Sequence, residues 1–135
     1  KHNIPLKVLI NTLILTVFAM VVFLSLLEPF IINFYGEEFK KVIDLVWIMI
    51  LGLAFHGMGD FINKFLGAKG YGKLIRNAAI ATGLSLLVLN VALIPLFNEF
   101  GAAYSTLVAG LVYFSMVARY YFKIISNKTT TRMVG

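Results

Sequence analysis

The chain has 135 residues, of which 60% are hydrophobic and 13% charged, and its mean hydropathy is +0.90. A soluble domain has about half apolar and about a quarter charged residues, because much of its surface faces water. The composition therefore excludes an ordinary soluble domain and indicates a chain whose solvent is mostly lipid. The net charge is +6, and the absence of cysteine excludes disulfides and thiolate metal sites.

Four apolar stretches predict four transmembrane helices, over residues 6–34, 41–65, 73–97 and 102–123. The first contains the unbroken run from Leu6 to Leu27, in which Lys7 is the one charged residue, and about 20 apolar residues suffice to cross the hydrocarbon core. Pro29 and Gly36 predict a kink and then an end for this helix. We expect the polar tail, 124–135, to fray.

Short loops between the four stretches predict an antiparallel, all-α bundle, since the backbone polar groups of a lipid-embedded segment must pair within helices. No low-complexity linker interrupts the sequence, so residues 1–135 form one domain. The chain begins at Lys1 rather than methionine, and we expect it to be the C-terminal membrane portion of a larger protein.

Basic residues are distributed asymmetrically with respect to the predicted helices. Ten of the twelve fall at one end of the bundle, and the other end holds Lys40, Lys41 and most of the acidic residues. Loops rich in Lys and Arg stay in the cytoplasm. The pattern predicts that both termini and the loop between the second and third helices are cytoplasmic.

Polar residues recur at helical spacing within three of the predicted helices. The resulting stripes are Gly52, His56, Asp60 and Asn63 on the second, Arg76, Gly83 and Asn90 on the third, and Ala102, Thr106, Gly110 and Tyr113 on the fourth. Such stripes face protein or water rather than lipid. Their small residues are suited to close packing between helices.

Ionisable groups within a membrane span are costly, which makes them candidates for a functional site. The candidates for lining a substrate cavity are His56, Asp60, Lys64, Arg76 and Asn90. His56 and Asp60, four residues apart, are placed to form a hydrogen-bonded pair or a proton-responsive site. The alternative for the charged groups is that they anchor helix ends at the interface, and the alternative for His56 is packing.

The segment "GAKGYGKL" has the glycine and lysine spacing of a phosphate-binding P-loop, at Gly67, Gly72 and Lys73. A P-loop requires a preceding strand and a Ser or Thr after the lysine, whereas here Leu74 follows and apolar spans flank the segment on both sides. The segment is thus predicted to be a tight cytoplasmic turn. No catalytic constellation is present, so we expect neither an enzyme nor a cofactor, metal, nucleotide or nucleic-acid site.

The chain resembles one known protein family, and the resemblance is carried by two stretches. They are "EPFIINFYGEEF" and "FLGAKGYGKLIRNAAIATGLSLLVLNVALIPLFNEFGAAYSTLVAGLVYF". Over nearly its whole length the chain resembles the C-terminal region of bacterial polysaccharide biosynthesis membrane proteins. These are oligosaccharide flippases of the multidrug/oligosaccharidyl-lipid/polysaccharide exporter superfamily. The resemblance lies in the turn after Gly36, the short basic loop, the Asn90 to Pro95 stretch and the "FGAAYST" start of the last helix.

The resemblance implies a protein of twelve to fourteen helices around a central cavity, of which this chain would form a half-bundle. The implied activity is movement of undecaprenyl-diphosphate-linked oligosaccharide across the bacterial cytoplasmic membrane for O-antigen, capsule or exopolysaccharide synthesis. The implied partners are the lipid-linked oligosaccharide, membrane lipids and polysaccharide assembly proteins. A cationic cavity suits such anionic cargo.

Other functions stay open on the sequence. Within the superfamily, the alternatives are a flippase for the lipid-linked peptidoglycan precursor and a cation-coupled drug exporter, although the exporter favours a deeper acidic site than Asp60. In a different class, a membrane scaffold would use the polar stripes only to pack its helices.

Overall fold

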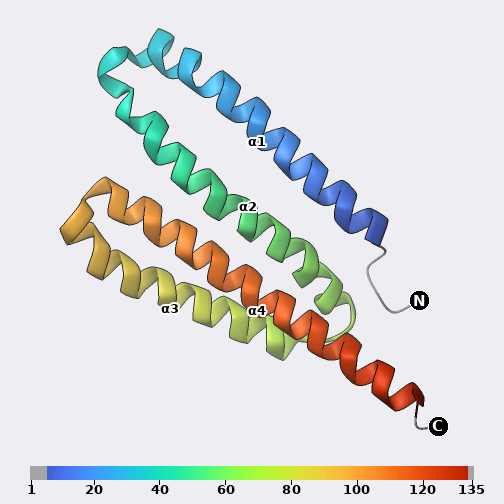
Figure 1. Cartoon of the computed structure of the whole chain (residues 1–135). Coiled ribbons are helices and arrows are strands. Elements are labelled where there is room, and N and C mark those ends of the chain that lie inside the picture. Colours follow the sequence, from blue (N-terminus) through green and yellow to red (C-terminus); the bar gives the residue numbers. More distant parts are fainter. Residues whose placement is uncertain (1–5, 134–135) are drawn as a thin grey trace.

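The protein is all-α, with four antiparallel helices joined by short turns (Figure 1). A computed structural model describes the backbone of residues 6–133 and the side chains of residues 7–125. The helices are α1 (Leu6–Tyr35), α2 (Lys41–Ala68), α3 (Gly72–Phe97) and α4 (Glu99–Met133), and a short 3-10 turn, η1 (Glu37–Phe39), precedes α2. Each of the four helices is long and apolar enough to cross a membrane. The predicted fold class is confirmed.

Helix boundaries agree with the sequence prediction to within one residue except at the end of α2, which continues to Ala68 rather than to residue 65, and at α4. This helix begins at Glu99 rather than at residue 102, because the reversal from α3 uses only Asn98, whose backbone has a positive φ of 52°. The tail is helical over 124–133, where α4 continues to Met133. No glycine or proline occurs between residues 124 and 133, and extending an existing helix costs little compared with starting one.

Two of the turns depend on a glycine in a conformation that other residues rarely adopt. Gly36, with φ at 95°, ends α1 and leads into η1, while Gly70, with φ at 81°, lies between α2 and α3. The amide of Tyr71 bonds the carbonyl of Leu66 at 3.1 Å, and that of Gly70 bonds Gly67 at 2.9 Å. These two bonds define a Schellman motif, which satisfies the last carbonyls of α2.

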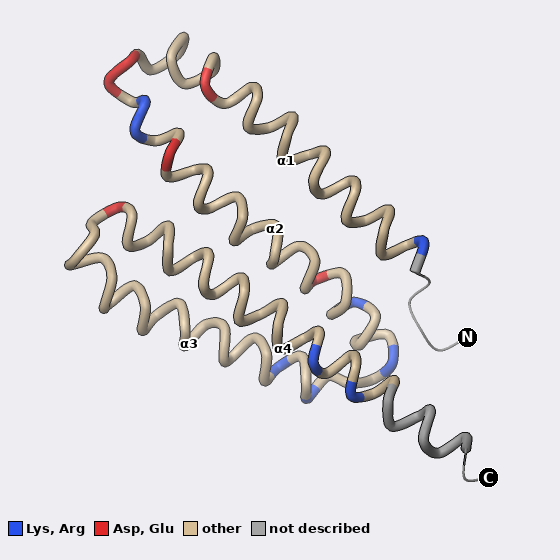
Figure 2. Tube along the Cα trace, viewed as in Figure 1, with Lys and Arg blue, Asp and Glu red and all other residues tan. Residues whose placement is uncertain are grey.

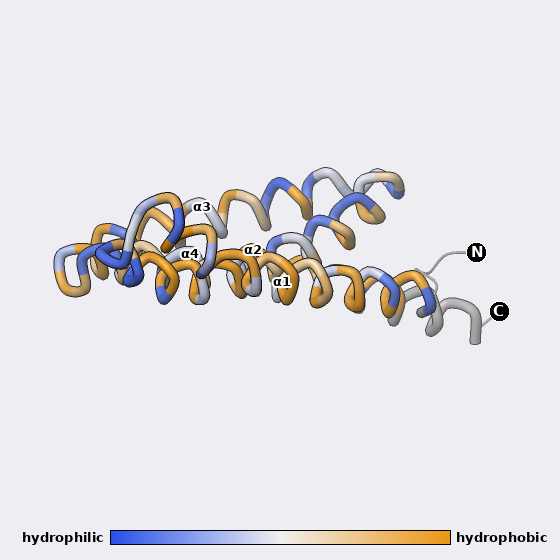
Figure 3. The backbone as a smooth tube through the Cα atoms, turned by 90° about the horizontal axis from the view of Figure 1, so that it is seen from above, coloured by the Kyte–Doolittle hydropathy of each residue, from blue (hydrophilic) through white to orange (hydrophobic). Residues whose placement is uncertain are grey.

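Helix α4 is the central element of the bundle. It packs extensively against both α2 and α3, whereas α1 packs only against α2 and η1. Seen from above, the helices form a thin layer with α3 displaced to one side (Figure 3). No described side chain of α1 is buried. The bundle is therefore open, and α1 occupies its outer edge.

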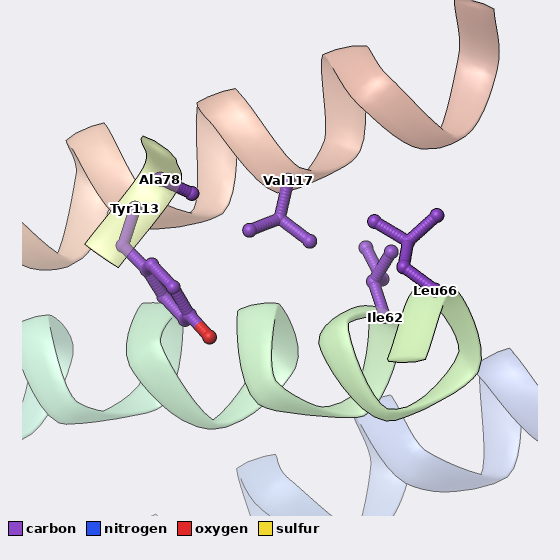
Figure 4. Packing of buried hydrophobic residues seen from close by; sticks show 5 residues of the cluster. All are labelled: Ile62, Leu66, Ala78, Tyr113 and Val117. Atoms are coloured by element: carbon purple, nitrogen blue, oxygen red, sulfur yellow. The ribbon is translucent and has the colours of Figure 1, made fainter. Parts of the chain in front are cut away.

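The buried residues lie on α4 and on the two helices that pack against it, α2 and α3. One cluster fills the end of the bundle near the α2–α3 turn (Figure 4), and its members are Ile62, Leu66, Ala78, Tyr113 and Val117. In lipid, helices gain little from the hydrophobic effect when they associate, so complementary packing must hold this cluster together.

Glycines allow α2 and α4 to approach closely near their middles. A Cβ at Gly110 would lie 2.3 Å from the Gly52 carbonyl oxygen, and a Cβ at Gly52 would lie 2.8 Å from the Leu107 Cα. Close packing through small residues is thus confirmed on these two stripes. Gly83 of α3 has open space where a Cβ would be, so the described structure gives it no such role.

Candidate functional site

A polar cluster lies where the polar stripe of α2 meets α4. Its members are His56, Asp60, Asn63 and Tyr113, and we call this set the tyrosine cluster. The Tyr113 hydroxyl donates a hydrogen bond to Asp60 Oδ1 at 2.8 Å and accepts one from Asn63 Nδ2 at 2.8 Å. Its oxygen points toward α2 in Figure 4. One side chain of α4 thereby engages two successive turns of α2.

Stacking completes the tyrosine cluster. The rings of His56 and Tyr113 are 4.9 Å apart with planes inclined by 26°. Tyr113 fits here because Gly59 has no side chain, and a Cβ at that position would lie 2.6 Å from the tyrosine ring. The ring is 5% exposed, while Asp60 is exposed. The tyrosine cluster thus links the buried side chain of Tyr113 to the exposed carboxylate of Asp60.

The expected direct pairing of His56 with Asp60 is absent among the described hydrogen bonds. Both side chains contact Tyr113 instead, His56 through its ring and Asp60 through its carboxylate. His56 and Asp60 are close because they are four positions apart on one helix. The Asp60 carboxylate nevertheless accepts its hydrogen bond from the Tyr113 hydroxyl of α4, which is directed at it.

The other candidate residues lie outside the tyrosine cluster. Lys64 and Arg76 are exposed, on α2 and α3 respectively, and neither forms an ion pair with a described residue. Asn90 is half-buried, and its side-chain oxygen has no hydrogen-bond partner. The structure therefore brings two of the five candidates together and leaves three apart.

Charge is segregated between the two ends of the bundle (Figure 2). The described ion pairs both lie at the acidic end, where Lys40 pairs with Glu28 at 3.8 Å and Lys41 with Glu99. The basic end holds the described cations Lys7, Lys64, Lys69, Lys73, Arg76, Arg119 and Lys123. Its cations form no ion pair within the described part of the chain.

Sequence reasoning did not select Tyr113 or Asn63 as site residues, although each lies on a predicted stripe. The missing information was the pairing of the second and fourth helices, which brings the two stripes face to face. A tyrosine on a stripe of small residues, opposite a glycine on the partner helix, is the signal that points to such a contact.

Comparison with known proteins returned nothing: no family model, curated protein or solved structure matches the chain. The class of protein consequently rests on the fold. Four helices of spanning length and apolar composition make the chain a membrane-spanning protein that crosses the bilayer several times.

Proposed function

We propose that the chain forms part of a transporter that moves undecaprenyl-diphosphate-linked oligosaccharide units across the bacterial cytoplasmic membrane. The observation that carries the proposal is the sequence resemblance to oligosaccharide flippases. Its most distinctive pieces coincide with the helix junctions, since the Gly36 turn, the Gly70 turn and the Asn98 reversal all fall within them. In this proposal the basic end of the bundle faces the cytoplasm.

Unpaired cations at the basic end support the choice of an anionic cargo. Asp60 accepts a hydrogen bond from Tyr113 and forms no ion pair with Lys64, so the ammonium of Lys64 and the guanidinium of Arg76 have no described carboxylate partner. Charge-assisted hydrogen bonds from such groups suit a diphosphate. The cargo would meet these groups before its glycan crosses the bilayer.

The openness of the bundle also supports a role within a larger transporter. The described residues bury few side chains, and none of those is on α1. A cavity for a large polar glycan requires further helices to close it. We propose that the stripe of α3, together with the exposed Asp60 and Lys64 of α2, contributes to one wall of that cavity and that the chain has no enzymatic activity.

The proposal is tested by replacing Arg76 with Gln in cells that depend on the protein for surface polysaccharide. We expect transport to fall about tenfold, the effect of losing one charge-assisted hydrogen bond to the diphosphate. The readout is accumulation of lipid-linked repeat units on the cytoplasmic leaflet. Lys40→Gln, which removes a cation from the acidic end, is the matched control and should leave transport unchanged.

Normal polysaccharide export in a strain that lacks the protein would overturn the flippase proposal. The Asp60–Tyr113–Asn63 hydrogen bonds favour one competitor, a membrane scaffold, because they pack α2 on α4 without any cargo. A scaffold predicts that Arg76→Gln leaves lipid-linked intermediates at their normal level while assembly with partner proteins is lost. Two related alternatives predict other outcomes in a strain that lacks the protein. A peptidoglycan-precursor flippase predicts accumulation of that precursor, and a drug exporter predicts sensitivity to drugs.

A further inference from the structure

The tyrosine cluster presents hydrogen-bonding atoms that the chain itself does not use. The second carboxylate oxygen of Asp60, the amide oxygen of Asn63 and the ring nitrogens of His56 have no hydrogen-bond partner among the described residues. The one described side-chain polar atom that is both buried and unpaired lies elsewhere, on Asn90. The free atoms of the tyrosine cluster are therefore open to a ligand.

These free atoms lie on one side of α2 and are held in place from α4. Positions 56, 60 and 63 fall within an arc of about 60° around the helix axis, and all three side chains contact Tyr113. The two hydrogen bonds of 2.8 Å and the stacked ring orient the side chains before a ligand arrives. Such preorganisation lowers the entropy lost on binding.

The chemistry of the free atoms suits a hydroxylated ligand without negative charge. Carboxylate and amide oxygens accept hydrogen bonds, and a neutral imidazole both donates and accepts, as the hydroxyl groups of a sugar do. An anion supplies acceptors, and the Asp60 carboxylate repels it. Ca²⁺ and Mg²⁺ require about six or more oxygen ligands, and the described residues contain no group of three His, Cys, Asp or Glu placed to hold a metal ion.

Lys64 relates this site to the diphosphate of the proposed cargo. It follows Asp60 by four residues, so it lies one helical turn, about 6 Å, nearer to the basic end on a neighbouring part of the same face. Its ammonium forms no ion pair with a described residue and suits a diphosphate oxygen. A diphosphate bound at Lys64 would place the sugar attached to it at the level of Asp60.

We infer that the tyrosine cluster binds the first sugar of the lipid-linked oligosaccharide, and that Asp60 restricts this position to an uncharged sugar. The inference rests on the proposed function. An acidic sugar would bring a second carboxylate beside Asp60, and like charges placed together across a binding site disfavour the complex. Asp60 is thus a specificity-determining residue for the cargo.

The test is uptake of two short-chain prenyl diphosphates by proteoliposomes that contain the transporter. One compound carries glucose, and the other carries glucuronic acid, which has a carboxylate in place of the hydroxymethyl group. We expect the glucose compound to be transported about tenfold faster. Asp60→Asn, which can still accept the Tyr113 hydrogen bond, should transport both at similar rates. Asp44→Asn, which removes an exposed carboxylate near the start of α2, is the matched control and should keep the preference.

Equilibrium binding of the same two compounds to the detergent-solubilised transporter gives a readout that needs no turnover, and the same loss of preference is expected in Asp60→Asn. Equal transport and binding of both compounds by the unaltered protein would overturn the inference alone, as would a preference that survives in Asp60→Asn. Failure of the unaltered protein to transport or bind either compound would overturn the proposed function, and the inference with it.

Discussion

Tyr113 connects two helices by using its hydroxyl both as donor and as acceptor. The donated bond reaches the Asp60 carboxylate and the accepted bond comes from the Asn63 amide. Interhelical hydrogen bonds in membrane proteins contribute about 0.6 kcal/mol on average. Two such bonds, together with the stacked His56 ring, make this residue the main polar link between α2 and α4.

Removal of the Tyr113 hydroxyl tests this link. We expect Tyr113→Phe to lower the free energy of unfolding in detergent by about 1 kcal/mol, because both bonds are lost while the ring and its packing remain. Equilibrium unfolding with a denaturing detergent provides the measurement. Tyr104→Phe is the control, since the hydroxyl of this exposed tyrosine makes no described hydrogen bond. Equal effects of the two variants would contradict the assignment.

At Gly110, α4 lies close to the backbone of α2. Replacement of Gly110 by Ala would put a methyl group 2.3 Å from the Gly52 carbonyl oxygen, so the helices must move apart. Overpacking of this kind costs about 1–3 kcal/mol, and we expect a loss of that size in unfolding free energy. Gly57→Ala on α2, where the new methyl meets open space, should be neutral or slightly stabilising through helix propensity.

At the scale of the elements, the α2–α3 turn shows what the glycines of "GAKGYGKL" do. Only Gly70 has a positive φ, and it occupies the left-handed position of the Schellman motif. Tyr71, the next residue, packs against the cluster that contains Leu66. The spacing that imitates a nucleotide-binding loop is therefore the spacing of a helix cap and the start of the next helix.

A pair of alanine variants distinguishes these glycines. We expect Gly70→Ala to lower the free energy of unfolding by about 1–2 kcal/mol, because an L-residue is strained in the left-handed region. Gly72→Ala should be tolerated, since this residue begins α3 and has open space where a Cβ would be. The two variants are compared by thermal unfolding in the same detergent. A larger effect at position 72 than at 70 would rule out the cap.

At the scale of the whole molecule, the segregated charges predict a single orientation in the membrane. The lack of native cysteine allows single cysteines to be placed at Glu38, in the turn of the acidic end, and at Lys69, beside the Gly70 turn. We expect an impermeant thiol reagent added to intact cells to label position 38 and not position 69. Inside-out vesicles should give the reverse pattern.

Labelling of both positions from the same side would contradict the antiparallel crossing of α2. Labelling of position 69 in intact cells and of position 38 in inside-out vesicles would contradict only the cytoplasmic placement of the basic end. The experiment thus separates the fold from its orientation, which follows from the charges alone.

The tyrosine cluster shows how far sequence reasoning reaches for a site. Helical periodicity placed His56, Asp60 and Asn63 on one face of α2 and Tyr113 on a face of α4, because periodicity is a local property. It did not identify the partner of either face. Lys64, Arg76 and Asn90 were grouped with the same site, and the fold leaves them apart from it.

The sequence by itself determined the four spanning helices, the all-α class and the two oppositely charged ends, because composition and local pattern govern these features. Tertiary structure alone decided that α4 is central, that α1 lies at the edge, and that Gly52 meets Gly110. The physical reason is the solvent. An apolar helix face packs equally well against lipid or another helix, so hydrophobicity does not select the neighbouring helix. The fit of small and polar groups selects it instead.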